Sequence, residues 1–126
     1  MRAAAPFLWT PVLLYMGLIF LLSSITDTPD LPQGSDKNLH ALLYAGLGAL
    51  VARALAGGWN RRLTIGMALA ATAISGLYGV SDEIHQHFVP PREADVFDVV
   101  ADTIGAAAAA AGLYVWSGII RGRDGL

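Results

Sequence analysis

The chain has 126 residues and a formal net charge of −2; 55% of its residues are hydrophobic, only 14% are charged, and the mean hydropathy is +0.53. A soluble domain carries roughly 25% charged residues, so this composition excludes an ordinary water-soluble protein and indicates a membrane protein. The absence of cysteine excludes disulfides, thiolate metal sites and cysteine nucleophiles.

Four apolar segments follow one another along the chain, at about residues 7–25, 39–56, 63–80 and 96–120. Each falls within the range of about 17–25 residues that a membrane-spanning helix needs, and each is too continuous for a barrel strand. The first is longer than the apolar core of a signal peptide, and no small-x-small cleavage site follows Ser23, so we expect it to remain as a helix. The sequence therefore predicts one all-α domain, residues 1–126, built as a four-helix transmembrane bundle.

Charged residues divide unequally between the two ends of this predicted bundle. Six of the eight basic residues lie near the chain ends or beside the loop between the second and third segments: Arg2, Arg53, Arg61, Arg62, Arg121 and Arg123. Nine of the ten carboxylates fall at the opposite end. Because basic residues mark the cytoplasmic side of membrane proteins, we expect both termini to be cytoplasmic and the polar helix ends to be extracytoplasmic.

The second segment opens with Asp36, Lys37, His40 and Tyr44, the last three of which share one helix face. A polar ring inside an apolar segment is costly when it faces lipid, so we expect His40 and Tyr44 to face the third and fourth segments. Asp36 and Lys37 also fit a structural role, as an N-cap and as a cation that extends to the membrane interface.

The third segment ends in a run of polar and ionisable residues, Asp82, Glu83, His85, Gln86 and His87. If the helix continues through them, Asp82, His85 and Gln86 share one face. Carboxylates and imidazoles at these spacings can act as general acids or bases, or bind a divalent metal. No zinc motif of the H-E-x-x-H type is present, so no metal is predicted, and His87 is expected to cap or solvate the helix end.

Pro90 and Pro91 end any helix at this point, because the second proline forces the residue before it out of the helical conformation. Arg92 follows as the one arginine of the acidic end. Its planar guanidinium suits bidentate pairing with a carboxylate or a phosphate. Arg92 is therefore expected either to fasten the loop by pairing with an acid such as Glu83 or Asp98, or to contact a ligand directly.

In the fourth segment Asp98, Asp102 and Gly105 lie on one helix face. Asp98 fits the favourable position of an acid in a first helical turn. Asp102 lies six residues inside the apolar segment, where an unpaired charge is expensive, so it should point into the bundle. Its candidate partners are His40, Lys37, Arg92 and a buried water.

Three of these blocks occur together in a pattern that resembles a known family. They read Asp36-Lys37-x-x-His40-x-x-x-Tyr44, Tyr78-Gly79-x-x-Asp82-Glu83-x-x-Gln86-x-Phe88-x-Pro90-x-Arg92 and Asp98-x-x-x-Asp102-x-x-Gly105. Over residues 36–112 the pattern is similar to the VanZ-like family of small bacterial integral membrane proteins. The resemblance implies a multi-pass protein of the bacterial inner (plasma) membrane. The founding relative is associated with low-level resistance to the glycopeptide teicoplanin, which implies a role in glycopeptide resistance. The family pattern usually has Asn in place of Asp102, so the acid adds a negative charge.

Functions of different classes fit these residues. In the first, an outward-facing polar pocket binds a membrane lipid headgroup, a lipid-linked cell-envelope precursor or a glycopeptide through Asp36, Lys37, His40, Tyr44, Tyr78, Asp82, Glu83, Gln86, Arg92, Asp98 and Asp102. In the second, the chain is an intramembrane hydrolase or transferase acting on a lipid-linked substrate, with Glu83, His85 or His40 as general acid or base. In the third, the polar network only locks the helices together. No cofactor and no nucleic-acid partner is predicted, and the sequence leaves enzymatic activity and oligomeric state open.

Overall fold

The computed structural model describes the backbone of residues 4–24, 35–88 and 96–124, and the side chains of residues 4–24, 38–88 and 96–120. These residues form four α-helices: α1, Ala5–Ser23; α2, Ser35–Ala56; α3, Ile65–His87; and α4, Val96–Asp124. No strand occurs in this part of the chain. Each helix is long and apolar enough to cross a membrane, which confirms the predicted all-α transmembrane fold.

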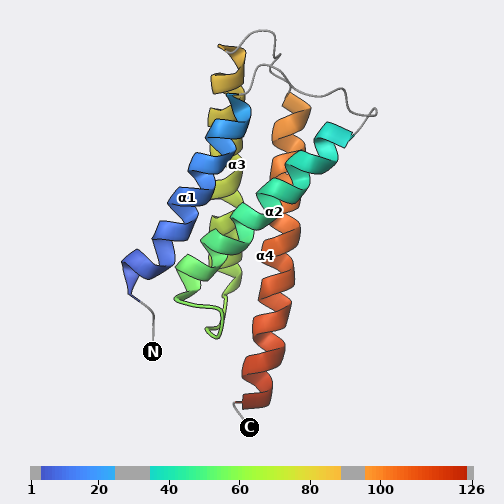
Figure 1. Ribbon diagram of the computed structural model, residues 1–126. Helices are drawn as coiled ribbons and strands as arrows, with labels where there is room; N and C mark the ends of the chain where they lie inside the picture. The colour runs from blue at the N-terminus through green and yellow to red at the C-terminus, as the bar shows by residue number, and fades with distance from the viewer. Residues whose placement is uncertain (1–3, 25–34, 89–95, 125–126) are drawn as a thin grey trace.

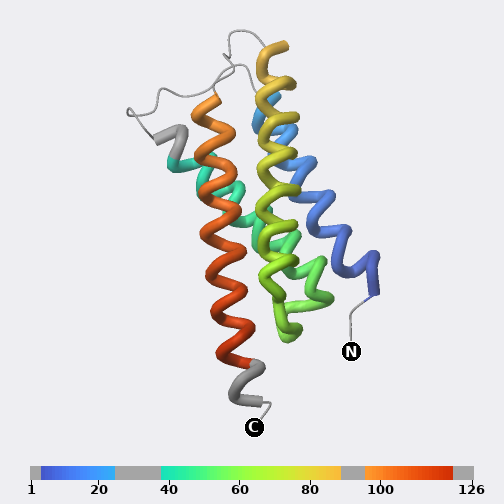
Figure 2. Tube along the Cα trace, turned by 180° about the vertical axis from the view of Figure 1, so that it is seen from behind, coloured from blue at the N-terminus to red at the C-terminus, as the bar shows by residue number. Residues whose placement is uncertain are grey.

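Successive helices run in opposite directions (Figure 1). One end of the bundle, here called the polar end, collects the last turns of α1 and α3 and the first turns of α2 and α4. The other end, here called the basic end, collects the start of α1, the end of α4 and the turn between α2 and α3 (Figures 1 and 2). Helix α2 packs against all three other helices, whereas α1 packs against α2 and α3 but not against α4 within the described residues.

Helices α2 and α4 approach each other closely because glycines lie at their contact. A Cβ atom added at Gly105 would overlap the carbonyl oxygen of Ala41, and one added at Gly48 would lie 2.8 Å from the Cα of Ala106. Small residues permit such backbone approach between transmembrane helices. The contact at Gly105 brings the first turns of α2 against the first turns of α4. The polar residues on these turns therefore lie close together.

Helix α1 is fastened to α2 through two backbone carbonyl groups. Pro11 lies inside α1 and has no N–H, so the carbonyl of Phe7 loses its helical donor. Nη1 of Arg53 in α2 donates to that carbonyl at 3.5 Å. In return, the Tyr15 hydroxyl of α1 donates to the carbonyl of Leu43 at 2.6 Å. The two helices are therefore linked at both the basic end and the middle of the bundle.

The turn between α2 and α3 depends on two glycines in left-handed backbone conformations, Gly57 with φ of 98° and Gly58 with φ of 141°. Both donate their N–H to the carbonyl of Arg53, which ends α2. Helix α3 then starts after Thr64, whose hydroxyl accepts a hydrogen bond from the N–H of Met67 at 3.1 Å. Helices α2 and α3 therefore form an antiparallel hairpin with a short turn.

The outer surface of the bundle is largely apolar, as a lipid environment requires. Large side chains such as Leu14, Leu42 and Leu77 are exposed, while Tyr44, Leu47 and other apolar side chains fill the interior. Several polar side chains point into the bundle instead: Asp82, Glu83, Gln86, Asp98 and Asp102 are all buried. Ionisable residues in membrane-spanning segments are expected to face the bundle interior, and these residues do.

Two helices extend further into the polar end than their hydropathy suggested. Helix α3 continues to His87 rather than ending near residue 80, and α2 begins at Ser35 rather than near residue 39. The apolar segment marks the part of a helix that lies in hydrocarbon, whereas helical hydrogen bonding continues through polar residues until a stop signal is reached. The ionisable residues at the end of α3 therefore lie on a helix, which settles which of them share a face.

Candidate functional site

His40 lies between two carboxylates of α4 at the polar end. Its Nδ1 lies 2.8 Å from Oδ1 of Asp102, and its Nε2 lies 3.8 Å from Oδ2 of Asp98. The His40 side chain is 13% exposed and that of Asp102 is fully buried. The Oδ2 atom of Asp102 has no hydrogen-bond partner within the described residues. The inward position expected for His40 is observed, and Asp102 pairs with one of the partners predicted for it.

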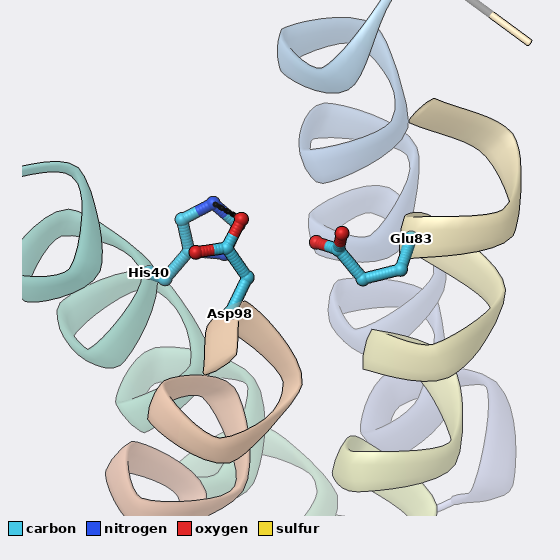
Figure 3. A group of neighbouring side chains, drawn as sticks. All are labelled: His40, Glu83 and Asp98. Carbon is cyan, nitrogen blue, oxygen red and sulfur yellow. Dashed lines mark ion pairs between the residues drawn. The ribbon is translucent and has the colours of Figure 1, made fainter. Parts of the chain in front are cut away.

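Glu83 of α3 completes this group, here called the His40 cluster: His40, Glu83, Asp98 and Asp102. One ligand atom each from His40, Glu83 and Asp98 lies within 4.8 Å of the others. The Glu83 carboxylate points from α3 toward His40 and Asp98 (Figure 3). Glu83 and Asp98 also have further interactions in the structure. The residues of the cluster come from three helices, so they are far apart in the sequence and do not form a linear motif.

The same geometry identifies which residues can hold a metal. An imidazole nitrogen and two carboxylate oxygens are ligands that divalent cations accept. A histidine that binds a metal usually donates its other N–H to a carboxylate, and Asp102 is placed to receive it from His40. The sequence predicted no metal because it contains no local ligand motif; His40, Glu83 and Asp98 are nevertheless the residues that can hold one.

Asp82 and His85, also on α3, have partners on α1. The Ser23 hydroxyl donates to Asp82, and the Gln86 amide lies 3.5 Å from the other Asp82 oxygen. Nε2 of His85 lies 2.9 Å from the Ser24 hydroxyl. The His85 ring also stacks on Phe20, with a distance of 4.3 Å between ring centroids. His85 was predicted as a candidate acid or base, and its described partners all belong to α1 rather than to the His40 cluster.

Sequence reasoning missed the two serines, Ser23 and Ser24, which connect α1 to this end of α3. A serine pair at the end of an apolar segment resembles many helix ends, and its partners lie about 60 residues away along the chain. The apolar character of the first segment gave no sign of a polar contact. Such a contact could have been suspected only because the serines are the most polar residues of that segment.

Two tyrosines lie between the cluster and the core. Tyr44 is buried, its ring centroid is 6.3 Å from that of Tyr78, and its hydroxyl has no hydrogen-bond partner within the described residues. The Tyr78 hydroxyl donates to the carbonyl of Met16 at 2.6 Å, so it forms another link between α3 and α1. The inward position expected for Tyr44 is observed.

Three predicted site residues cannot be placed. Arg92 lies outside the described residues, as do the side chains of Asp36 and Lys37. The prediction that Arg92 pairs with Glu83 or Asp98 therefore stays a prediction.

Comparison with known proteins decides the family. The sequence model of the family described as VanZ/LLP1 matches residues 7–117, which contain α2 and α3 and most of α1 and α4. The chain belongs to the VanZ/LLP1 family. No curated protein and no solved structure matches the chain. The VanZ/LLP1 match extends beyond the motif blocks to α1, the helix that the two serines and two tyrosines fasten to the rest of the bundle.

Proposed function

We propose that this VanZ/LLP1 protein binds a membrane lipid headgroup, a lipid-linked cell-envelope precursor or a glycopeptide at the His40 cluster. The observation that carries the proposal is the burial of three carboxylates beside one imidazole in helices of membrane-spanning length. Ionisable groups inside a membrane are costly and usually mark a functional site. The association of the founding family member with teicoplanin resistance supports the glycopeptide as one of the three ligands.

The chemistry of the cluster favours a ligand that donates hydrogen bonds. An ionised carboxylate only accepts hydrogen bonds, and the cluster contains three carboxyl groups. Sugar or glycerol hydroxyls and the ammonium group of an amine supply matching donors. Lys37 and Arg92, whose side chains lie outside the described residues, are the expected contacts for an anionic group such as phosphate.

We further propose that the protein lies in a bacterial inner membrane with both termini in the cytoplasm, so that the His40 cluster opens outward. The distribution of basic residues supports this orientation, because Arg53, Arg61 and Arg62 all lie at the basic end. Ligands for the cluster would then come from the outer leaflet or from the cell envelope.

Native mass spectrometry of the detergent-purified protein tests the binding. The wild type should retain a lipid through detergent exchange, and His40→Gln and Glu83→Gln should lose it. Loss of one hydrogen bond to a charged group costs about 1.5–3 kcal/mol, which corresponds to a roughly ten- to hundredfold weaker affinity. His87→Gln is the matched control, because His87 lies on the same helix end but is exposed.

A second measurement covers the glycopeptide. Delipidated wild type should bind an added glycopeptide of the teicoplanin type in competition with the lipid, and the His87→Gln variant should do the same. If the wild type and His40→Gln carry the same lipids in the same amounts, and neither binds glycopeptide, the proposal is wrong. Circular dichroism of each variant separates lost binding from lost folding.

A second candidate function, an intramembrane hydrolase or transferase, is favoured by the contact between His40 and Asp102. A carboxylate that holds an imidazole at 2.8 Å can orient it and stabilise its protonated form during general acid or base catalysis. The same mass spectra distinguish the two functions. Bound lipid that loses its headgroup with the wild type, but stays intact with His40→Gln, indicates an enzyme, whereas lipid of unchanged mass indicates binding alone.

A further inference from the structure

A second ionisable group is buried at the opposite end of the bundle from the His40 cluster. Arg53, in the last turn of α2, is only 8% exposed. Its guanidinium carbon lies 4.7 Å from the ring centroid of Phe7 and 5.6 Å from that of Trp59. Within the part of the chain that the structure describes, no carboxylate pairs with Arg53, and its Nε is buried without a hydrogen-bond partner. Among the described residues, Arg53 is therefore an enclosed cation without a counter-charge.

The contacts that Arg53 does have compensate only part of this burial. One of its five N–H groups, on Nη1, donates to the Phe7 carbonyl, which lacks a helical donor because of Pro11; the N···O distance is long, at 3.5 Å. Aromatic rings and the C-terminal end of a helix both favour a nearby cation. None of these groups carries a full negative charge, and a buried charge without a counter-charge destabilises a fold. An anionic ligand would supply what is missing.

A pocket is present beside Arg53, between α2, the α2–α3 turn and α4. The residues that line it include Arg53, Trp59, Arg61, Leu63, Trp116 and Ser117, here called the Arg53 pocket. The Ser117 hydroxyl accepts from the N–H of Leu63 at 3.0 Å and donates to the carbonyl of Tyr114 at 3.1 Å, so it ties this wall of the pocket together. Because Arg53 and Arg61 both line the pocket, it contains two guanidinium groups.

The surroundings of the pocket match the headgroup region of a membrane. Trp59 and Trp116 are both exposed, and tryptophan is enriched where membrane meets water. Along α4, Val115 and Ile119 are exposed beside Trp116 and offer an apolar surface to acyl chains. Basic pockets between transmembrane helices bind anionic lipid headgroups, and guanidinium pairs with phosphate in a bidentate manner.

We propose that the Arg53 pocket binds the phosphate group of an anionic membrane phospholipid, with Arg53 as the buried anchor and Arg61 as the second cation. The site is separate from the His40 cluster and does not depend on the function proposed for it. Phosphate oxygens at the mouth of this small pocket accept hydrogen bonds from the guanidinium groups that line it, and the acyl chains of the lipid lie against the exposed apolar side chains of α4.

Thermal unfolding of the full chain in a neutral detergent tests this site. Phosphatidylglycerol, phosphatidylcholine and inorganic phosphate are titrated separately against the wild type. Phosphatidylglycerol should bind about two- to fivefold more tightly than phosphatidylcholine, because both lipids carry a phosphate but the choline group of phosphatidylcholine adds a cation that the two guanidinium groups repel. Inorganic phosphate should have no comparable effect, because it lacks the acyl chains.

Three variants make the test specific. Arg61→Gln should weaken the phosphatidylglycerol affinity about three- to fivefold, as expected for a partly exposed ion pair, and Arg53→Gln should abolish the preference for this lipid. Arg62→Gln removes the same charge from the neighbouring residue, which is exposed and does not line the pocket, so it should leave the affinity within about twofold.

Equal weakening by Arg61→Gln and Arg62→Gln would show unspecific attraction to a basic surface and overturn the proposal. An unchanged lipid preference in folded Arg53→Gln would also overturn it. An inorganic phosphate effect equal to that of phosphatidylglycerol would assign the pocket to a free anion instead of a lipid. His40→Gln should behave as the wild type here, so this site and the His40 cluster can fail independently.

Discussion

Asp102 is the most deeply buried of the described carboxylates, and its only described hydrogen-bond partner is His40, 2.8 Å away. The asparagine that the VanZ-like pattern usually has at this position would keep an oxygen acceptor for the imidazole but would bring no charge. The acid therefore alters the charge of the His40 cluster more than its hydrogen-bonding geometry. A protein of this family with Asp102 should favour more strongly cationic ligands than a relative with asparagine.

Substitutions of Asp102 should separate these two contributions. Asp102→Ala removes the hydrogen-bond partner of the buried His40 imidazole and leaves the Asp98 carboxylate 3.8 Å away, so its cost should approach, but not exceed, the about 3–5 kcal/mol of unfolding free energy for breaking a buried pair. Asp102→Asn keeps the acceptor, so its cost should be about 1–2 kcal/mol. Thermal or denaturant unfolding of the three proteins in one detergent measures the order. If alanine and asparagine destabilise equally, the hydrogen bond to His40 contributes little to stability.

The residues whose inward position the sequence predicted correctly are those whose chemistry conflicts with their surroundings. His40 and Asp102 each lie inside an apolar segment, and this conflict alone predicts that they turn inward. This conflict cannot predict which helix faces pack against each other. The sequence therefore did not distinguish Asp82 and His85, which form hydrogen bonds to α1, from Glu83, which belongs to the His40 cluster. Arg53 was read only as a marker of orientation, because its burial depends on Pro11 and Phe7 of another helix.

At the scale of the helices, the contact between α2 and α4 determines the geometry of the cluster. Gly105 lies one turn after Asp102, and Ala41, whose carbonyl it meets, is the neighbour of His40. The hydrogen bond between His40 and Asp102 is therefore formed where the backbones of the two helices lie close together. The sequence showed that α4 contains small residues, but it did not show which residues of α2 pack against them. The point at which two helices cross depends on both helices together and cannot be predicted from the sequence of either one.

A side chain at Gly105 should separate the helices and disturb the cluster. Gly105→Ala should destabilise the fold by about 1–3 kcal/mol, because its methyl group has no room beside the Ala41 carbonyl. Gly112→Ala is the matched control on the same helix: nothing lies within 4 Å of an added Cβ there, so the higher helix propensity of alanine should leave stability unchanged or raised by about 0.5–1 kcal/mol. Unfolding in detergent measures both. Equal destabilisation by the two variants would contradict the close contact.

Hydropathy predicted the number of helices but not their length at the polar end. Helix α3 continues to His87 because residues such as Glu83 and Gln86 are good helix formers, although they lower the hydropathy. The added turns carry the acceptors that meet α1 and α4. The polar end of α3 is therefore helical through His87, a possibility that the sequence left open.

At the scale of the whole molecule, the two ends of the bundle differ in chemistry. Buried acids and the only described histidines gather at the polar end, whereas Arg53, Arg61 and Arg62 lie at the basic end. The even number of helices brings the start of α1 and the end of α4 to the same side (Figure 1). This part of the predicted topology is observed, and which side faces the cytoplasm remains the proposal made above.

Reporter fusions determine that orientation. A fusion after Arg123 should report the cytoplasm, because the basic residues flanking the helices favour that side. A fusion at Phe88, after α3, should report the opposite side and serves as the matched control. A C-terminal fusion that reports the periplasm, together with a cytoplasmic signal from the Phe88 fusion, would reverse the orientation and place the His40 cluster inside.

The separation of buried charge along the bundle also makes the protein an electric dipole, with Arg53 near one pole and the carboxylates of the His40 cluster near the other. A bacterial inner membrane is negative on its inner face, and moving one charge across its full potential changes the energy by about 2.3 kcal/mol per 100 mV. In the proposed orientation the arginine lies toward the negative face and the carboxylates toward the positive face, so each experiences a favourable part of the field. An energised membrane would then hold this protein more firmly in place than a de-energised one, and a detergent micelle, which has no such field, would understate its stability in the cell.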